Sequence, residues 1–180
     1  MSFDQVNAGE SFERKKREIR AHVGLAKLVA VPREEFERRA AASNNLAIEC
    51  EAGHISESEY RERSAALLDM PNVLTFRSLS EFSYALRLLL TEDRVKAVLS
   101  HENAHMGRIE HHNLEGYYKI AFVKGEGDEI GIIPLAGFEH PEDMSFEELF
   151  RLDEDITSAP DELSEGDKAA LEALRSRNKS

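Results

Sequence analysis

The sequence predicts an α+β fold with a helical N-terminal part, a histidine-bearing helix, and a small antiparallel β-hairpin after that helix. Three observations predict it. Apolar residues recur at helical spacing over about residues 10–70. A second helical pattern leads into the segment SHENAHMGRIEHHN at residues 100–113, which holds 4 of the chain's 7 histidines. Beyond it, β-branched and aromatic residues flank a glycine-containing turn, which is typical of a hairpin.

The N-terminal part is expected to form consecutive helices. The first ends before Pro32, and Pro32 itself suits the first turn of a second helix that runs to about Glu51. Residues 56–59, Ser-Glu-Ser-Glu, resemble a capped helix start, and the third helix ends near Asp69. The short apolar run 73–76 then predicts a strand.

The central part should contain two helices and the hairpin. An amphipathic helix precedes Thr91, and the next helix carries the histidines. Residues 117–123 and 130–133 are the two predicted strands, and Pro134 is expected to end the second. A short helix is predicted at 145–150.

The chain divides accordingly into three predicted parts. Residues 1–72 form a helical segment, residues 73–156 carry the candidate metal site, and residues 157–180 are a polar tail with a helix near 167–175.

Composition limits the classes of function. The net charge of -12 repels nucleic acid and anionic lipid surfaces, so neither is an expected partner. No run of about 18 apolar residues predicts a membrane span, and the expected location is cytoplasmic. Cys50 is the single cysteine, which excludes a disulfide within the chain and any cysteine-rich zinc motif. A bound metal would therefore have nitrogen and oxygen ligands.

The order His101-Glu102-Asn103-Ala104-His105 has the spacing of a helical metal site. Residues four apart lie on one helix face, about 6 Å from each other, so both imidazoles can reach one ion. Glu102 is rotated by about 100° from His101, which places its carboxylate outside the ligand shell but within reach of a metal-bound water.

This segment resembles the zincin metallopeptidases, whose active-site helix carries the motif H-E-x-x-H. The resemblance covers about residues 98–112. It implies Zn²⁺ as the cofactor, His101 and His105 as zinc ligands, and Glu102 as the general base. The implied substrate is a peptide or protein.

His111 is the expected third ligand, because it stands where the metzincin pattern H-E-x-x-H-x-x-G-x-x-H has its third histidine. The glycine of that pattern is replaced by Arg108, with Gly107 one position early. A straight helix cannot bring His111 to the metal, since it rises by about 1.5 Å per residue, so the chain would have to turn near Gly107. Other ligands remain open: His112, Glu110, Glu115, His140, Glu126 and Glu129.

Two functions follow from these observations. The first is a zinc-dependent metallopeptidase that uses Glu102 to activate a zinc-bound water, with an extended peptide lying along the hairpin edge. The alternative is a non-enzymatic helical interaction protein with a degenerate or structural metal site. The number of protein ligands distinguishes them, because a catalytic zinc keeps an open position.

Overall fold

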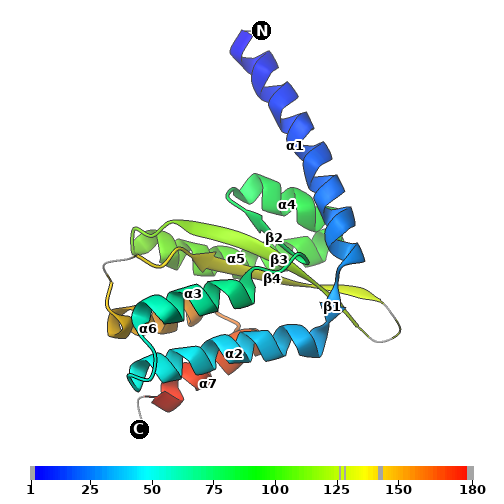
Figure 1. The fold of residues 1–180 in the computed structure, drawn as a ribbon. Helices are drawn as coiled ribbons and strands as arrows, with labels where there is room; N and C mark the ends of the chain where they lie inside the picture. Colours follow the sequence, from blue (N-terminus) through cyan, green and yellow to red (C-terminus); the bar gives the residue numbers. More distant parts are fainter. Residues whose placement is uncertain (1–2, 126, 128, 142–143, 178–180) are drawn as a thin grey trace.

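The computed structural model describes residues 3–125, 127, 129–141 and 144–177. Helices and strands follow one another as a mixed α+β arrangement (Figure 1). The helices are α1 (Phe3–Leu28), α2 (Arg33–Glu51), α3 (Glu57–Leu68), α4 (Leu79–Arg87), α5 (Glu92–His111), α6 (Phe146–Thr157) and α7 (Glu165–Arg177). The strands are β1 (Val31–Pro32), β2 (Val73–Phe76), β3 (Gly116–Lys124) and β4 (Ile130–Phe138). The predicted fold class is confirmed.

Strand β3 is the centre of the sheet. It pairs with β4 on one side as the predicted antiparallel hairpin, and with β2 on the other, with Thr75 opposite Lys119. The short β1 adds a parallel pair at the end of β3, where Val31 lies opposite Val123. This strand was not expected in the helical N-terminal part, because two residues carry no readable period.

The prediction that Pro134 ends the second strand is wrong, because β4 continues to Phe138. In β4 the N–H of Ala136 points away from β3, toward the Glu102 carboxylate. Strand geometry repeats every two residues, so the nitrogen of Pro134 faces the same outer edge. A proline there removes no hydrogen bond to β3, which is why the strand passes through it.

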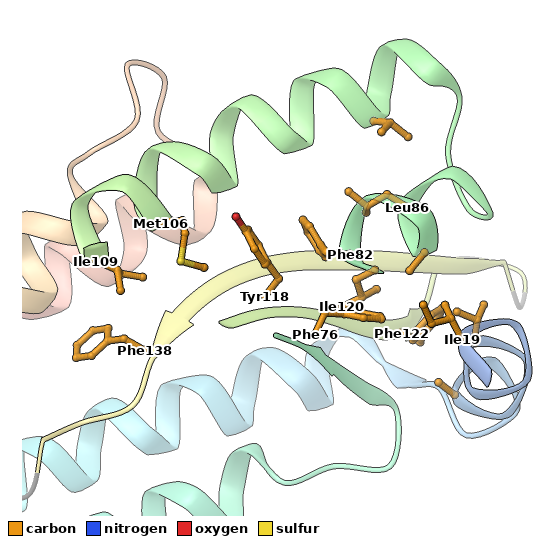
Figure 2. Close-up of a cluster of buried hydrophobic side chains, with 14 of the residues drawn as sticks. Ile19, Phe76, Phe82, Leu86, Met106, Ile109, Tyr118, Ile120, Phe122 and Phe138 are labelled. Atoms are coloured by element: carbon orange, nitrogen blue, oxygen red, sulfur yellow. The ribbon is translucent and has the colours of Figure 1, made fainter. Parts of the chain in front are cut away.

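The larger hydrophobic core lies between one face of the sheet and the helices α1, α4 and α5 (Figure 2). Tyr118 and Phe122 alternate along β3 and so point to this face. The Phe82 ring of α4 stacks on the Tyr118 ring at a centroid distance of 4.5 Å. Met106 and Ile109 attach α5 to the same surface. These contacts fix the rotation of α5 about its axis, and with it the direction of the motif side chains.

The opposite side of the sheet faces α2 and α3, which pack against each other (Figure 1). A second cluster forms there around Leu46 and Tyr60, and Phe146 of α6 joins it. From the same helix, Leu149 and Ile156 enter the larger core. Helix α6 therefore connects the two cores. It is longer than the six residues predicted from sequence.

In the described part of the chain, no helix is long and apolar enough to cross a membrane. The three-part division of the chain stays a prediction. Within the predicted N-terminal segment, β1 is a strand of the central sheet and α1 contacts β2 and β3.

Candidate metal centre

Helix α5 is continuous through the motif. It begins after Thr91 and runs to His111, so His101 and His105 lie one turn apart on the same face. Their Nε2 atoms are 3.3 Å apart, and the two rings meet edge to face with centroids 4.9 Å apart. Both imidazoles therefore direct the same ring nitrogen into one small volume.

The third group in this volume is Asp167, from the start of α7. Its Oδ2 atom lies 3.0 Å from His101 Nε2, and its Oδ1 atom lies 3.4 Å from His105 Nε2. One ligand atom from each of the three residues falls within 4.8 Å of the others. His101, His105 and Asp167 thus form a group that could hold a metal ion.

The dimensions of this group fit a tetrahedral ion. With bonds of about 2.0–2.1 Å, the ligand atoms of a tetrahedral site are about 3.3–3.4 Å from one another. The two Nε2 atoms are 3.3 Å apart, and each lies 3.0 or 3.4 Å from a different oxygen of Asp167, so each of these separations is close to that edge length.

Local sequence explains the position of Asp167. The N–H and the hydroxyl of Ser164 donate to Asp167 Oδ2 at 2.8 and 2.7 Å, and Asp167 N–H donates back to Ser164 Oγ at 3.1 Å. This reciprocal capping at the first turn of α7 fixes the carboxylate. Leu171, buried one turn later, holds the helix against the body of the protein.

The second ring nitrogen of His105 is also fixed. Nδ1 lies 2.8 Å from the carbonyl oxygen of Ile156 in α6, and because a carbonyl only accepts, Nδ1 carries the hydrogen. In the neutral ring, Nε2 then presents its lone pair to the group. Metal-ligating histidines commonly have this second hydrogen bond.

The charges in the group favour a cation. Burial acts to raise the pKa of Asp167, but hydrogen bonds from His105 and Ser164 outweigh it and hold the pKa at about 2. Burial acts to lower the pKa of His105, and the Asp167 carboxylate, the Ile156 carbonyl and Glu102 together raise it. The ionised Asp167 carboxylate thus favours a positive charge at His105, and a metal ion in the same position would be favoured by the same carboxylate.

Glu102 lies beside this group without belonging to it. Its side chain is buried, with 4% of the residue exposed. Burial, together with the charge of Asp167, raises the pKa of Glu102 to about 7, although His105 and the N–H of Ala136 act in the opposite direction. A carboxyl with this pKa can release and take up a proton near neutrality.

The structure does not bring His111 to the other donors. Helix α5 does not turn at Gly107, and the His111 side chain is exposed, with its ring 5.5 Å from that of His112. His112 pairs instead with Asp155 of α6 at 2.7 Å. Of the remaining candidates, Glu110, Glu115, Glu129 and His140 are not in the donor group, and Glu126 lies outside the described residues.

Asn103, the polar residue in the middle of the motif, also has a structural role. The Tyr118 hydroxyl donates to Asn103 Oδ1 at 2.9 Å. This bond joins α5 to β3 on the side of the helix away from the donor group. Tyr118 is therefore a packing residue of the main core.

Comparisons of the chain with protein-family models, with curated proteins and with solved structures found no match. Two cavities, of about 540 and 510 Å³, lie elsewhere on the molecule, and none of the three donor residues lines either of them. The assignment of a function therefore rests on the geometry of His101, Glu102, His105 and Asp167.

Proposed function

We propose that this protein is a zinc-dependent metallopeptidase. His101, His105 and Asp167 hold the metal, and Glu102 is the general base. One observation carries the proposal: one donor atom from each of three residues lies within 4.8 Å of the other two, beside the buried carboxyl of Glu102, whose pKa is raised to about 7. Asp167 replaces His111 as the third ligand in this proposal.

The donor set supports a catalytic site for zinc. Two imidazoles and one carboxylate are typical zinc ligands, and three protein ligands leave one position open. In the part of the chain that the structure describes, no fourth donor joins the group. The His101 side chain is 22% exposed, whereas that of His105 is 8% exposed. Solvent and substrate therefore reach the group from the His101 side.

The role of Glu102 follows from its protonation equilibrium. Zinc would lower the pKa of water and polarise a peptide carbonyl. Glu102 takes the proton of the attacking water and passes it to the leaving amine. A pKa of about 7 suits both transfers, because the group is present in both protonation states at neutral pH.

The outer edge of β4 is the surface on which we place an extended peptide. Beyond β4 no further strand pairs in the described sheet. In an antiparallel strand the N–H and C=O of one residue point to the same side, so the carbonyls of Pro134 and Ala136 face this edge. Glu102 approaches the same edge at Ala136, which brings the bound peptide next to the base.

The test compares Glu102→Gln with wild type after both are loaded with zinc. A mixed library of peptides is the substrate, and cleavage is read by mass spectrometry. The variant should retain zinc and lose about 10²–10⁴ in rate, which is the usual contribution of general acid–base catalysis. Glu110→Gln, an exposed change on the same helix, is the control and should cleave normally.

Two results would contradict the proposal. One is zinc-loaded wild type that cleaves no peptide, and the other is a Glu102→Gln variant that retains full activity or fails to bind zinc.

A structural metal in a non-enzymatic interaction protein is the second candidate. The position of Asp167 favours it, because one ion would join α7 to α5. A structural zinc has four protein ligands. X-ray absorption of the zinc-loaded protein distinguishes the two: three protein ligands and a water support the peptidase, and four protein ligands support the structural site.

A further inference from the structure

A cavity of about 510 Å³ opens on the face of the sheet opposite α5. It lies between α3, the strands β2 and β3, and the residues that follow β4. None of its lining residues belongs to the metal group, and Glu102 does not reach it. The cavity and its lining residues are therefore separate from the proposed peptidase site.

Two cations line this cavity and have no carboxylate partner among the described residues. In the described parts of the chain, the lysines and arginines that are partly buried are Lys16, Arg39, Arg61 and Lys119. Lys16 and Arg39 form ion pairs with glutamates. For Arg61 and Lys119, no described carboxylate lies within ion-pair distance, and both face this cavity.

The contacts of the two cations leave donors available. The Arg61 guanidinium donates to the carbonyls of Pro141 and Met144 at 3.2 and 3.3 Å, which occupies two of its five N–H groups. The Lys119 ammonium lies 4.7 Å from the centre of the Tyr117 ring, and this contact uses no hydrogen-bond acceptor.

The acidic residues of the cavity do not neutralise Lys119. Glu139 is paired with Arg77. Burial lowers the pKa of Lys119 and Arg77 lowers it further, while the charge of Asp69 acts in the opposite direction without overcoming them. The half-buried Lys119 ammonium has lost hydration that no carboxylate in the described part of the chain replaces. A bound anion would replace it.

The remaining wall combines aromatic and apolar side chains with the polar residues Ser64, Asp69, Thr75 and Glu139. Tyr60, Tyr117 and Phe138 contribute rings, and Met70 lies among them. His140 also lines the cavity, and loss of hydration there together with the charge of the nearby Arg61 lowers the pKa of its imidazole. A cavity that combines aromatic and apolar walls with a few polar groups is typical of small-molecule sites, and its volume suits a small organic ligand.

We infer that this cavity binds a small organic anion, with Lys119 and Arg61 holding a carboxylate or phosphate group and the aromatic wall covering its apolar body. The chain as a whole carries a net charge of -12 and repels anions. Saturable binding of an anion must therefore come from a local arrangement such as this one.

The experiment titrates zinc-loaded protein with phenyl phosphate, benzoate and phenol, and follows backbone amide chemical shifts. At least one anion should bind saturably, with shifts at residues 60–75, 117–119 and 138–140. Phenol, which has the ring without the charge, should bind at least about tenfold more weakly. The tighter of the two anions identifies the head group.

Lys119→Met keeps the length of the side chain and removes the charge, and it should weaken the anion at least about tenfold. Lys124→Met is the control, because it removes the same charge from an exposed position on the same strand. It should bind the anion as wild type does. Thermal unfolding verifies the fold of both variants, and burial of the Lys119 charge predicts no loss of stability in Lys119→Met.

Three results would overturn the inference. They are no saturable binding up to about 10 mM, equal weakening in the two lysine variants, and shifts centred on residues 101–105 and 167. The last would place the anion at the metal group instead.

Discussion

Glu102→Gln should stabilise the metal-free protein in a manner that depends on pH. The carboxyl is 4% exposed, and burial raises its pKa from 4.5 to about 7. Between these values the folded chain binds more protons than the unfolded chain, so the free energy of unfolding falls as pH rises through this window. At pH 8 the ionised carboxylate lowers the stability by on the order of 3 kcal/mol relative to a neutral group. At pH 5 the effect is below about 1 kcal/mol.

The assay is urea unfolding of wild type and Glu102→Gln with a chelator present, at pH 5 and pH 8. Glutamine has the shape of the acid but no charge, so the variant should gain little at pH 5 and on the order of 3 kcal/mol at pH 8. Glu110→Gln, exposed on the same helix, should show no such gain. Two results would refute the claim that the ionised, buried Glu102 carboxylate destabilises the folded protein. One is an equal effect of Glu102→Gln at both pH values, and the other is a loss of stability in this variant at pH 8.

Further predictions concern packing, capping and metal affinity. Gly137→Ala places a Cβ 2.7 Å from the Tyr117 ring and should destabilise the protein by about 1–3 kcal/mol in thermal or urea unfolding. Gly107→Ala meets nothing within 4 Å and should be neutral or stabilising by up to about 1 kcal/mol. Ser145→Ala removes a capping box and should lower the free energy of unfolding by about 1 kcal/mol, whereas Thr91→Ala, at a cap with no side-chain hydrogen bond, should change it much less. Zinc competes with protons for the ligand imidazoles, so its affinity in a chelator competition should be at least about tenfold weaker at pH 5.5 than at pH 7.5; an affinity independent of pH would exclude histidine ligands.

Local patterns predicted the elements of the fold well. The strand at 73–76 and the hairpin after α5 are confirmed, because β-branched and aromatic runs bounded by turn residues have a strong local signal. β4 extends past Pro134 because it is an edge strand, and edge position depends on tertiary pairing. The two-residue β1 exists through its pairing with β3 alone.

In the candidate site, too, sequence predicted the local features and missed those that depend on tertiary contacts. The spacing of His101 and His105 is local to one helix, so sequence alone places them on one face. Asp167 lies in a segment predicted to be a polar tail. The pattern Ser164-Glu165-Gly166-Asp167 is the local signal of this capped helix start, because a serine and an acid three residues apart can cap each other. Nothing local indicates that this helix start packs beside α5, since that contact depends on α6 and the buried side of α7.

The raised pKa of Glu102 could not be predicted from the sequence either. It depends on burial against β4 and on the charge of Asp167, and both are tertiary. Sequence spacing gave only the direction of the side chain on the helix.

The metal content of ligand variants tests the central claim most directly. Protein without a histidine tag is equilibrated with zinc at neutral pH, freed of excess ion, and analysed for metal per chain. Wild type and His111→Ala should each retain about one zinc, because three ligands suffice and His111 is outside the group. His105→Ala and Asp167→Ala should retain none. Wild type without stoichiometric zinc, or an Asp167→Ala variant that keeps zinc while His111→Ala loses it, would contradict the assignment of His101, His105 and Asp167 as the metal centre.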